Sequence, residues 1–242
     1  MKTIKGFLSL LLMIAFFIGA SSVAVAERSV GQTAESWATD PKTGCQVCWA
    51  ADTNTIIAAT WSGPKVNNKA EGKGMLTLTL RATDGREVKG EGEVEMKAGK
   101  LDGKGTIKWS DGKSYEGDYK EGKRCGKGIM KWPNGGTYEG DWENDTANGQ
   151  GRLEAFKGDI YDGGWKAGKR DGKCVYKMAN GTVYEGDAKS DKLVGKGKIT
   201  YPNGSVYEGD VDGCKPSGHG ILKDPSGKVL YEGESKNASE QF

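Results

Sequence analysis

The chain has 242 residues, of which 39 are glycine. That glycine share is about twice the usual level of roughly 7%, and no collagen-type triplet accounts for it. Low aliphatic content beyond the first 26 residues excludes a large globular core, and 35 Lys and Arg against 33 Asp and Glu exclude a strongly basic surface for nucleic acid.

The first 26 residues are typical of a secretory signal peptide. Lys2 and Lys5 precede an uncharged apolar run at 7–20, and Ala24-Val25-Ala26 fits the small-x-small cleavage rule. The run is short for a membrane-spanning helix, which needs ~20 residues, so cleavage before Glu27 is favoured over an uncleaved anchor. Cleavage leaves 33 basic and 33 acidic residues, a net charge of zero. We therefore expect an exported protein, periplasmic or extracellular, with no nucleic-acid partner.

Residues 27–71 form an N-terminal lead-in segment. It contains Cys45-Gln46-Val47-Cys48-Trp49 and then the β-branched run Thr55-Ile56-Ile57. β-Branched and aromatic residues favour strands, so we expect one or two strands here. The stretch 64–70 is interpreted as a loop.

Strand signals become regular from residue 72. Leu76, Leu78 and Leu80 alternate with polar residues, as in a strand with one buried face. Asp84-Gly85 then predicts a turn. This first unit is four residues longer than those that follow, and terminal repeats are often atypical in this way.

A 23-residue period then governs the chain. Tyr115-Glu116-Gly117-Asp118 recurs, with small changes, at Tyr138, Tyr161, Tyr184 and Tyr207. A fixed period of about 20–50 residues is the signature of a repeat architecture. A turn glycine also recurs, at residues 112, 135, 158, 181, 204 and 227, and four of these follow Asn or Asp, a strong hairpin signal. Each unit is therefore predicted to be two short strands.

The alternation of side chains assigns the motif to two faces. Tyr115, Gly117 and Tyr119 share one face of the first strand, whereas Glu116 and Asp118 take the other. Large aromatic rings can lie across the gaps that glycines leave. On the opposite face we expect acids of the first strand to pair with lysines of the second.

The spacing Tyr-x-Gly-x-(Trp/Tyr), followed by Gly-x-Gly and a turn Gly, resembles the MORN repeat (membrane occupation and recognition nexus). The resemblance covers residues 103–233 well and 72–102 loosely, and Trp61-Ser62-Gly63 resembles the lead-in of secreted bacterial members. It implies an all-β fold, an elongated single-layer twisted antiparallel sheet of stacked β-hairpins with a groove. It also implies a scaffold or binding role, in places lipid binding or self-association. Residues 72–233 are thus assigned to repeats and 234–242 to a polar tail.

Large aromatic residues are the candidate binding surface. Such a stripe could bind sugar rings, lipid or a peptide, or it could pack on itself to hold the sheet together. The candidate groove residues are Tyr115, Tyr119, Trp132, Tyr138, Trp142, Tyr161, Trp165, Tyr184 and Tyr207.

Cys45 and Cys48 form a Cys-x-x-Cys motif. A thioredoxin-type dithiol needs a helix N-terminus to lower a thiol pKa, and no helical pattern follows Cys48. In an exported protein a disulfide is the alternative, within the lead-in segment or between these two residues. Zinc would need a second ligand pair, and His219 is the only histidine, so we expect no metal and no cofactor.

The three remaining cysteines fall in different repeats. Strands lie ~4.8 Å apart, so one hairpin advances ~10 Å along the sheet. A disulfide needs Cα atoms within about 7 Å. Cys125, Cys174 and Cys214 are therefore expected to be too far apart to pair.

No catalytic constellation is present in the repeats. The sequence favours an exported, non-enzymatic scaffold that mediates protein–protein interaction or self-association, with an unidentified protein partner. An envelope module that binds membrane lipid or cell-wall glycan through the aromatic groove is the first alternative. A thiol-disulfide enzyme built on Cys45 and Cys48 is the second.

Overall fold

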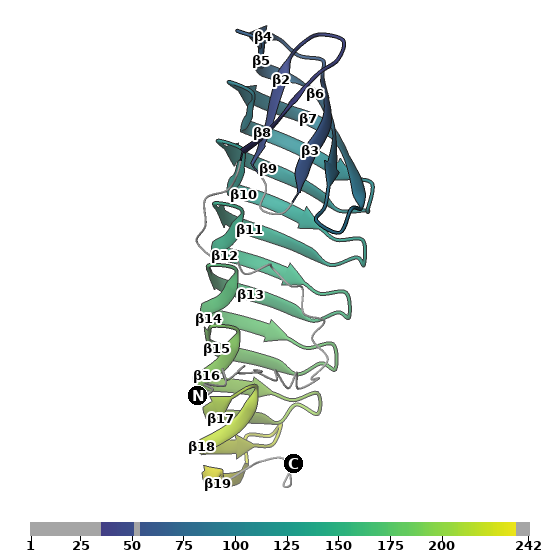
Figure 1. The fold of residues 1–242 in the computed structure, drawn as a ribbon. Coiled ribbons are helices and arrows are strands. Elements are labelled where there is room, and N and C mark those ends of the chain that lie inside the picture. Colours follow the sequence, from purple (N-terminus) through teal and green to yellow (C-terminus); the bar gives the residue numbers. More distant parts are fainter. Residues whose placement is uncertain (1–34, 51–53, 236–242) are drawn as a thin grey trace, which may run out of the picture.

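The computed structural model describes residues 35–50 and 54–235, and this part of the chain contains strands and no helix (Figure 1). Fifteen strands form one long antiparallel sheet, and four short ones form a small sheet at its N-terminal end. From β7 to β19 every strand pairs with its neighbours in sequence. The predicted all-β fold, an elongated twisted sheet of stacked hairpins, is confirmed.

The strand bounds follow the 23-residue period. The small sheet consists of β1 (Glu35–Thr39), β2 (Gln46–Ala50), β5 (Lys69–Ala70) and β4 (Lys65–Val66). The long sheet consists of β3 (Thr55–Trp61), β6 (Gly72–Arg81), β7 (Glu87–Lys97), β8 (Lys100–Trp109), β9 (Ser114–Lys120), β10 (Lys123–Lys131), β11 (Thr137–Glu143), β12 (Thr146–Glu154), β13 (Ile160–Lys166), β14 (Lys169–Lys177), β15 (Val183–Lys189), β16 (Lys192–Thr200), β17 (Val206–Asp212), β18 (Lys215–Lys223) and β19 (Val229–Ser235).

The lead-in segment is built into the array. Strand β3 pairs with β6 and is the first strand of the long sheet. The carboxylate of Asp40, which is buried, accepts a hydrogen bond from the backbone N–H of Trp61 (3.1 Å) and so ties the small sheet to β3. The loop expected at 64–70 instead contains the short hairpin β4–β5. Asn67 and Asn68 form its turn with positive φ (50° and 61°), a conformation that Asn tolerates.

Two kinds of turn alternate along the sheet. Strands β9 and β10 are joined by Glu121 and Gly122, both with positive φ (49° and 84°), as in a two-residue type I′ hairpin. The longer connections between repeats contain the turn glycines identified in the sequence. Gly112 and Gly135, for example, have φ of 87° and 88°. One short and one long turn together complete one repeat, so the same structural position recurs every 23 residues along the sheet.

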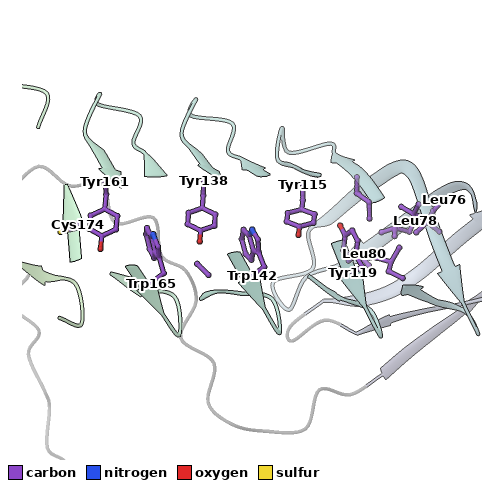
Figure 2. Close-up of a cluster of buried hydrophobic side chains, with 14 of the residues drawn as sticks. Leu76, Leu78, Leu80, Tyr115, Tyr119, Tyr138, Trp142, Tyr161, Trp165 and Cys174 are labelled. Atoms are coloured by element: carbon purple, nitrogen blue, oxygen red, sulfur yellow. The ribbon is translucent and has the colours of Figure 1, made fainter. Parts of the chain in front are cut away.

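Each second strand contains a bulge at the first glycine of its pair. Between β9 and β10 the register shifts from Cys125 to Gly128, and Gly126 has φ of 57°. A bulge bends its strand and increases the local twist. Figure 2 shows the result, with tyrosine and tryptophan rings in one row and strand segments on either side. The aromatic face is therefore enclosed by the bent hairpins themselves.

Candidate functional site

The motif tyrosines lie flat over glycines on the inner face of the sheet. A Cβ added to Gly128 would lie 2.3 Å from the Tyr115 hydroxyl oxygen, so glycine is required beneath the ring. Each hydroxyl then donates a hydrogen bond to the carbonyl three residues further along its own strand. The distances are 3.3 Å for Tyr115, 3.0 Å for Tyr138, 2.8 Å for Tyr161, 2.9 Å for Tyr184 and Tyr207, and 2.7 Å for Tyr231.

Tryptophans connect these tyrosines across successive repeats. Trp142 contacts the rings of Tyr115 and Tyr138 edge-on, with ring centres 5.4 and 5.2 Å apart. Its indole N–H donates to the carbonyl of Gly128 (3.2 Å), a contact that is buried. Trp165 repeats the arrangement with Gly151 (3.0 Å). Edge-to-face pairs stabilise a fold beyond the area they bury, so this row is the core of the array.

The expectation of an open aromatic groove is therefore wrong. Eight of the nine candidate residues expose at most 7% of their surface, and Trp132 is half-buried against the same core. Rings covered by their own hairpins offer no platform for a sugar or a lipid. The alternative, that the stripe packs on itself, matches the structure. The sequence feature that indicates burial of the tyrosine is the glycine two residues after it, because a residue without a side chain leaves space for the ring to pack flat against the strand.

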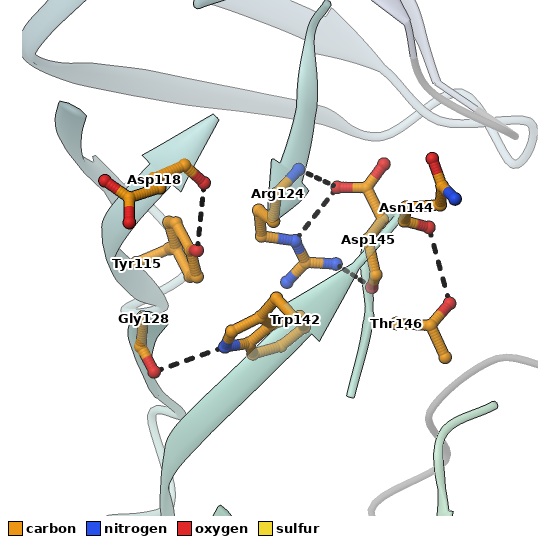
Figure 3. Close-up of polar contacts among 8 residues, drawn as sticks. All are labelled: Tyr115, Asp118, Arg124, Gly128, Trp142, Asn144, Asp145 and Thr146. Atoms are coloured by element: carbon orange, nitrogen blue, oxygen red, sulfur yellow. Dashed lines mark hydrogen bonds and ion pairs between the residues drawn. The ribbon is translucent and has the colours of Figure 1, made fainter. Parts of the chain in front are cut away.

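An arginine fastens one hairpin to the next (Figure 3). The Arg124 guanidinium lies over the Trp142 ring, 4.3 Å from its centre. Its Nε donates to the Asp145 carboxylate (3.0 Å) and its Nη2 to the Asp145 carbonyl (2.9 Å). Two repeats later Arg170 makes the same contacts with Asp191. The periodicity of the sequence did not single out these two arginines.

The two cysteines of the Cys-x-x-Cys motif are buried. Cys45 and Cys48 each expose 1% of their surface, and the structure has both as free thiols, with no disulfide between them. Burial raises the pKa of the Cys48 thiol to about 11 and also raises the pKa of Cys45. A nucleophilic cysteine needs the opposite shift. Cys125, Cys174 and Cys214 are also free.

One row of ion pairs runs across the outer face and connects consecutive repeats. Lysines of one strand pair directly with acids of the next: Lys73 with Glu95 (3.1 Å), Lys104 with Asp118, Lys127 with Asp141 and Lys173 with Asp187 (2.7 Å each), and Lys196 with Asp210 (3.0 Å). The expected pairing within one hairpin occurs between Lys198 and Glu185 (3.6 Å) and between Lys223 and Glu208 (3.3 Å), whereas this row of shorter ion pairs connects adjacent hairpins. The bulge at the first glycine offsets the two strands of a hairpin, whereas strands of adjacent repeats stay in register.

The motif aspartate has a second role in this row. Asp141 accepts a hydrogen bond from the backbone N–H of Gln150 (2.8 Å) beside the bulge glycine of β12, while its other oxygen pairs with Lys127. Asp210 does the same for His219 and Lys196. These bonds lower the pKa of both carboxyls below the ordinary value, with the lysine hydrogen bond as the largest cause. The aspartate therefore stabilises the bulge on which the bend depends.

A second row on the outer face is formed by the motif glutamates. Glu116 lies directly opposite Ile129, and Ile129 lies opposite Glu139. Glu93 belongs to the same row and lies opposite Met75. All three glutamates are exposed, and none has an ion pair within 4 Å among the residues that the structure describes.

Between the two rows a groove of about 830 Å³ crosses β6 to β11. Its floor is backbone, because glycines such as Gly117 and Gly128 direct their Cα hydrogens toward the inner rings. Its walls are the unpaired glutamates on one side and the paired lysines on the other. This groove is a concave surface on which polar groups converge, and so it is the candidate functional site.

Residues 35–50 and 54–235 contain neither a candidate metal cluster nor a candidate membrane-spanning helix. No group of three or more His, Cys, Asp or Glu side chains there is arranged to hold a metal ion. The same residues include no helix of the length and hydropathy needed to cross a membrane.

The hairpin array, with a tyrosine over a glycine in every repeat, defines an antiparallel β-repeat protein. The sequence model of the MORN repeat matches five consecutive segments, residues 95–114, 115–137, 138–160, 161–183 and 184–206. Residues 95–206 therefore belong to the MORN repeat family. Comparison with curated proteins found no match. Strands β17 to β19, beyond the matched segments, continue the same tyrosine contacts through Tyr207 and Tyr231.

Proposed function

We propose that this protein is an exported, non-enzymatic scaffold that binds a protein partner along the outer groove of β6 to β11. A protein- or membrane-binding role is what MORN repeats indicate. The observation that carries the proposal is the groove itself, whose unpaired Glu93, Glu116 and Glu139 stand beside it while the aromatic face is closed.

Charge favours a protein over a membrane as the partner. Anionic lipid headgroups attract clusters of free lysines and arginines. In the groove the lysines already have acidic partners, as Lys104 has Asp118 and Lys127 has Asp141. The unpaired groups that remain are carboxylates, which repel such headgroups. Glycan binding through stacked aromatic rings is disfavoured by the burial of those rings.

A photo-crosslinking experiment tests the proposal. A benzoylphenylalanine is placed at Ile129, between Glu116 and Glu139, and for comparison at Ile221, which has the equivalent place opposite Glu208 in β18. Irradiation of producing cells should give one defined protein adduct at Ile129 and none at Ile221. The same adducts at both positions, or none at either, would contradict the proposal.

Self-association is a second candidate, supported by the C-terminal edge of the long sheet. Among the described strands, β19 pairs only with β18, and Val229 and Leu230 expose 49% and 55% of their surface. An exposed apolar edge strand is a template for pairing with another chain. Light scattering after size exclusion should then give a dimer that Leu230→Lys converts to a monomer. A monomeric wild-type protein would exclude it.

A further inference from the structure

We propose that the outer groove binds an extended peptide with a lysine or arginine at every third residue. The inference rests on the proposed function, because it specifies the partner of the same groove. It follows from three observations: which acids lack cations, how far apart they lie, and what lies between them.

Three consecutive acids of the glutamate row lack a cation where the row borders the groove, and Glu232 on the edge strand β19 also has none within 4 Å among the described residues. In the same row beyond the groove, Asp162 lies near Arg152 (3.8 Å), Glu185 near Lys198 (3.6 Å) and Glu208 near Lys223 (3.3 Å). The repeat thus supplies a cation for these glutamate-row positions in its C-terminal half. At Glu93, Glu116 and Glu139 the described part of the chain supplies none within 4 Å. Complementary charge from a partner is what this stretch of the row lacks.

The spacing of these acids matches an extended chain. They lie on β7, β9 and β11, so each is two strands from the next. With strands ~4.8 Å apart the separation is ~9.6 Å. A polyproline II helix rises ~3.1 Å per residue and has three residues per turn, so side chains on one face recur every ~9.3 Å. Cations at positions i, i+3 and i+6 can therefore meet all three glutamates.

The groove also provides contacts for the residues between those cations. Its floor is glycine backbone at Gly105, Gly117 and Gly128, which lets a chain approach closely. Apolar side chains flank the acids at two places, since Ile129 separates Glu116 from Glu139 and Met75, 44% exposed, lies opposite Glu93. Proline or other apolar residues between the cations would contact these side chains.

Fluorescence anisotropy with two labelled peptides tests the spacing. One peptide is Lys-Pro-Pro repeated three times; the other has the same composition with the three lysines adjacent. The spaced peptide should bind at least about tenfold more tightly. Single exposed charge pairs change affinity by up to about fivefold, so the triple variant Glu93→Gln/Glu116→Gln/Glu139→Gln should lose roughly 30-fold. Binding should weaken as salt is raised.

A matched variant separates the groove from general charge. Glu185→Gln/Glu208→Gln removes two acids of the same row that already have lysine neighbours, and it should bind the spaced peptide as the wild type does. Equal binding of both peptides, or an equal loss in both variants, would overturn the inference. A crosslinked partner at Ile129 without binding of the spaced peptide would refute the inference alone; absence of both would refute the proposed function as well.

Discussion

Arg124 and Asp145 are joined by four hydrogen bonds across neighbouring hairpins, one of them from the Asp145 backbone N–H to the Arg124 carbonyl (3.0 Å). The backbone N–H and Nε of Arg124 both donate to one carboxylate oxygen of Asp145, at 2.9 and 3.0 Å, and Nη2 donates to the Asp145 carbonyl. Asp145 lies in a two-residue turn with φ of 68°. These hydrogen bonds hold the turn that contains Asp145. They also hold the Arg124 guanidinium in place over the Trp142 ring.

A double-mutant cycle measures this contact. Arg124→Ala, Asp145→Ala and the double variant should give a coupling free energy of about 1–2 kcal/mol from urea unfolding. The equivalent pair Arg170–Asp191 is the control. Asp191 is 48% exposed and Asp145 only 16%, so solvent should reduce the second coupling to below about 1 kcal/mol. Equal coupling free energies for the two pairs would show that burial of the aspartate does not determine the strength of the Arg–Asp contact.

The glycine beneath each ring should not tolerate a methyl group. A Cβ at Gly140 would lie 2.5 Å from the Cα of Gly151 and 2.6 Å from the carbonyl oxygen of Gln150, and backbone cannot move aside as a side chain can. Gly140→Ala should reduce the free energy of unfolding by about 3 kcal/mol, measured by urea unfolding.

A turn glycine provides the control for that substitution. Gly213 has φ of 61° and no atom within 4 Å of an added Cβ, and Asn144 occupies the equivalent turn position three repeats earlier in the array with φ of 49°. Asn tolerates positive φ, so Gly213→Asn should change the free energy of unfolding by less than about 1 kcal/mol. A large loss there, or a small one for Gly140→Ala, would contradict the packing described.

Alkaline pH should unfold the protein progressively. Burial raises the pKa of Cys48 from 9.0 to about 11, that of Cys214 to about 12 and that of Tyr184 from 10.0 to about 12. Because the folded state holds these protons more tightly, the stabilisation is complete below pH 9 and is lost as pH rises to 11–12. The urea midpoint from circular dichroism should fall above pH 9. Cys48→Ala should fall less steeply, and a midpoint constant from pH 8 to 11 would refute the assignment.

Export is the fourth expectation and concerns residues outside the described part of the chain. The full-length protein, produced in a secretion-competent bacterium, should be recovered outside the cytoplasm with Glu27 as its first residue by N-terminal sequencing. A variant lacking residues 2–26 should remain in the cytoplasm. Recovery of the intact N-terminus from the membrane fraction would instead indicate an uncleaved anchor.

The sequence predicted the fold well because the repeat unit is local. The 23-residue period, the turn glycines and the Tyr-x-Gly spacing determine two strands and two turns, and neighbours in sequence are neighbours in the sheet. Alternation also assigned Tyr115 and Glu116 to opposite faces correctly. It could not show that the face of Tyr115 is covered, because coverage depends on the bulge at Gly126, where a positive φ bends the strand.

The candidate site was less accessible to sequence reasoning. The groove depends on register across strands: which lysine lies opposite which acid, and which glutamate is left over. Lys127 could pair with Asp118 or Asp141 by sequence alone, and only the offset introduced by the bulge selects Asp141. Glu116 is unpaired because Ile129 lies opposite it, whereas Glu185 has Lys198 at the equivalent position.

The one-dimensional order of the long sheet also determines how it would respond to force. From β7 to β19 each described strand pairs in the sheet only with its neighbours in sequence. A pull applied between the two ends of the sheet acts along those hydrogen bonds and loads the strand pairs in series. Strand pairs should then separate one after another from the less stable end of the sheet, and the sheet should not unfold in a single step.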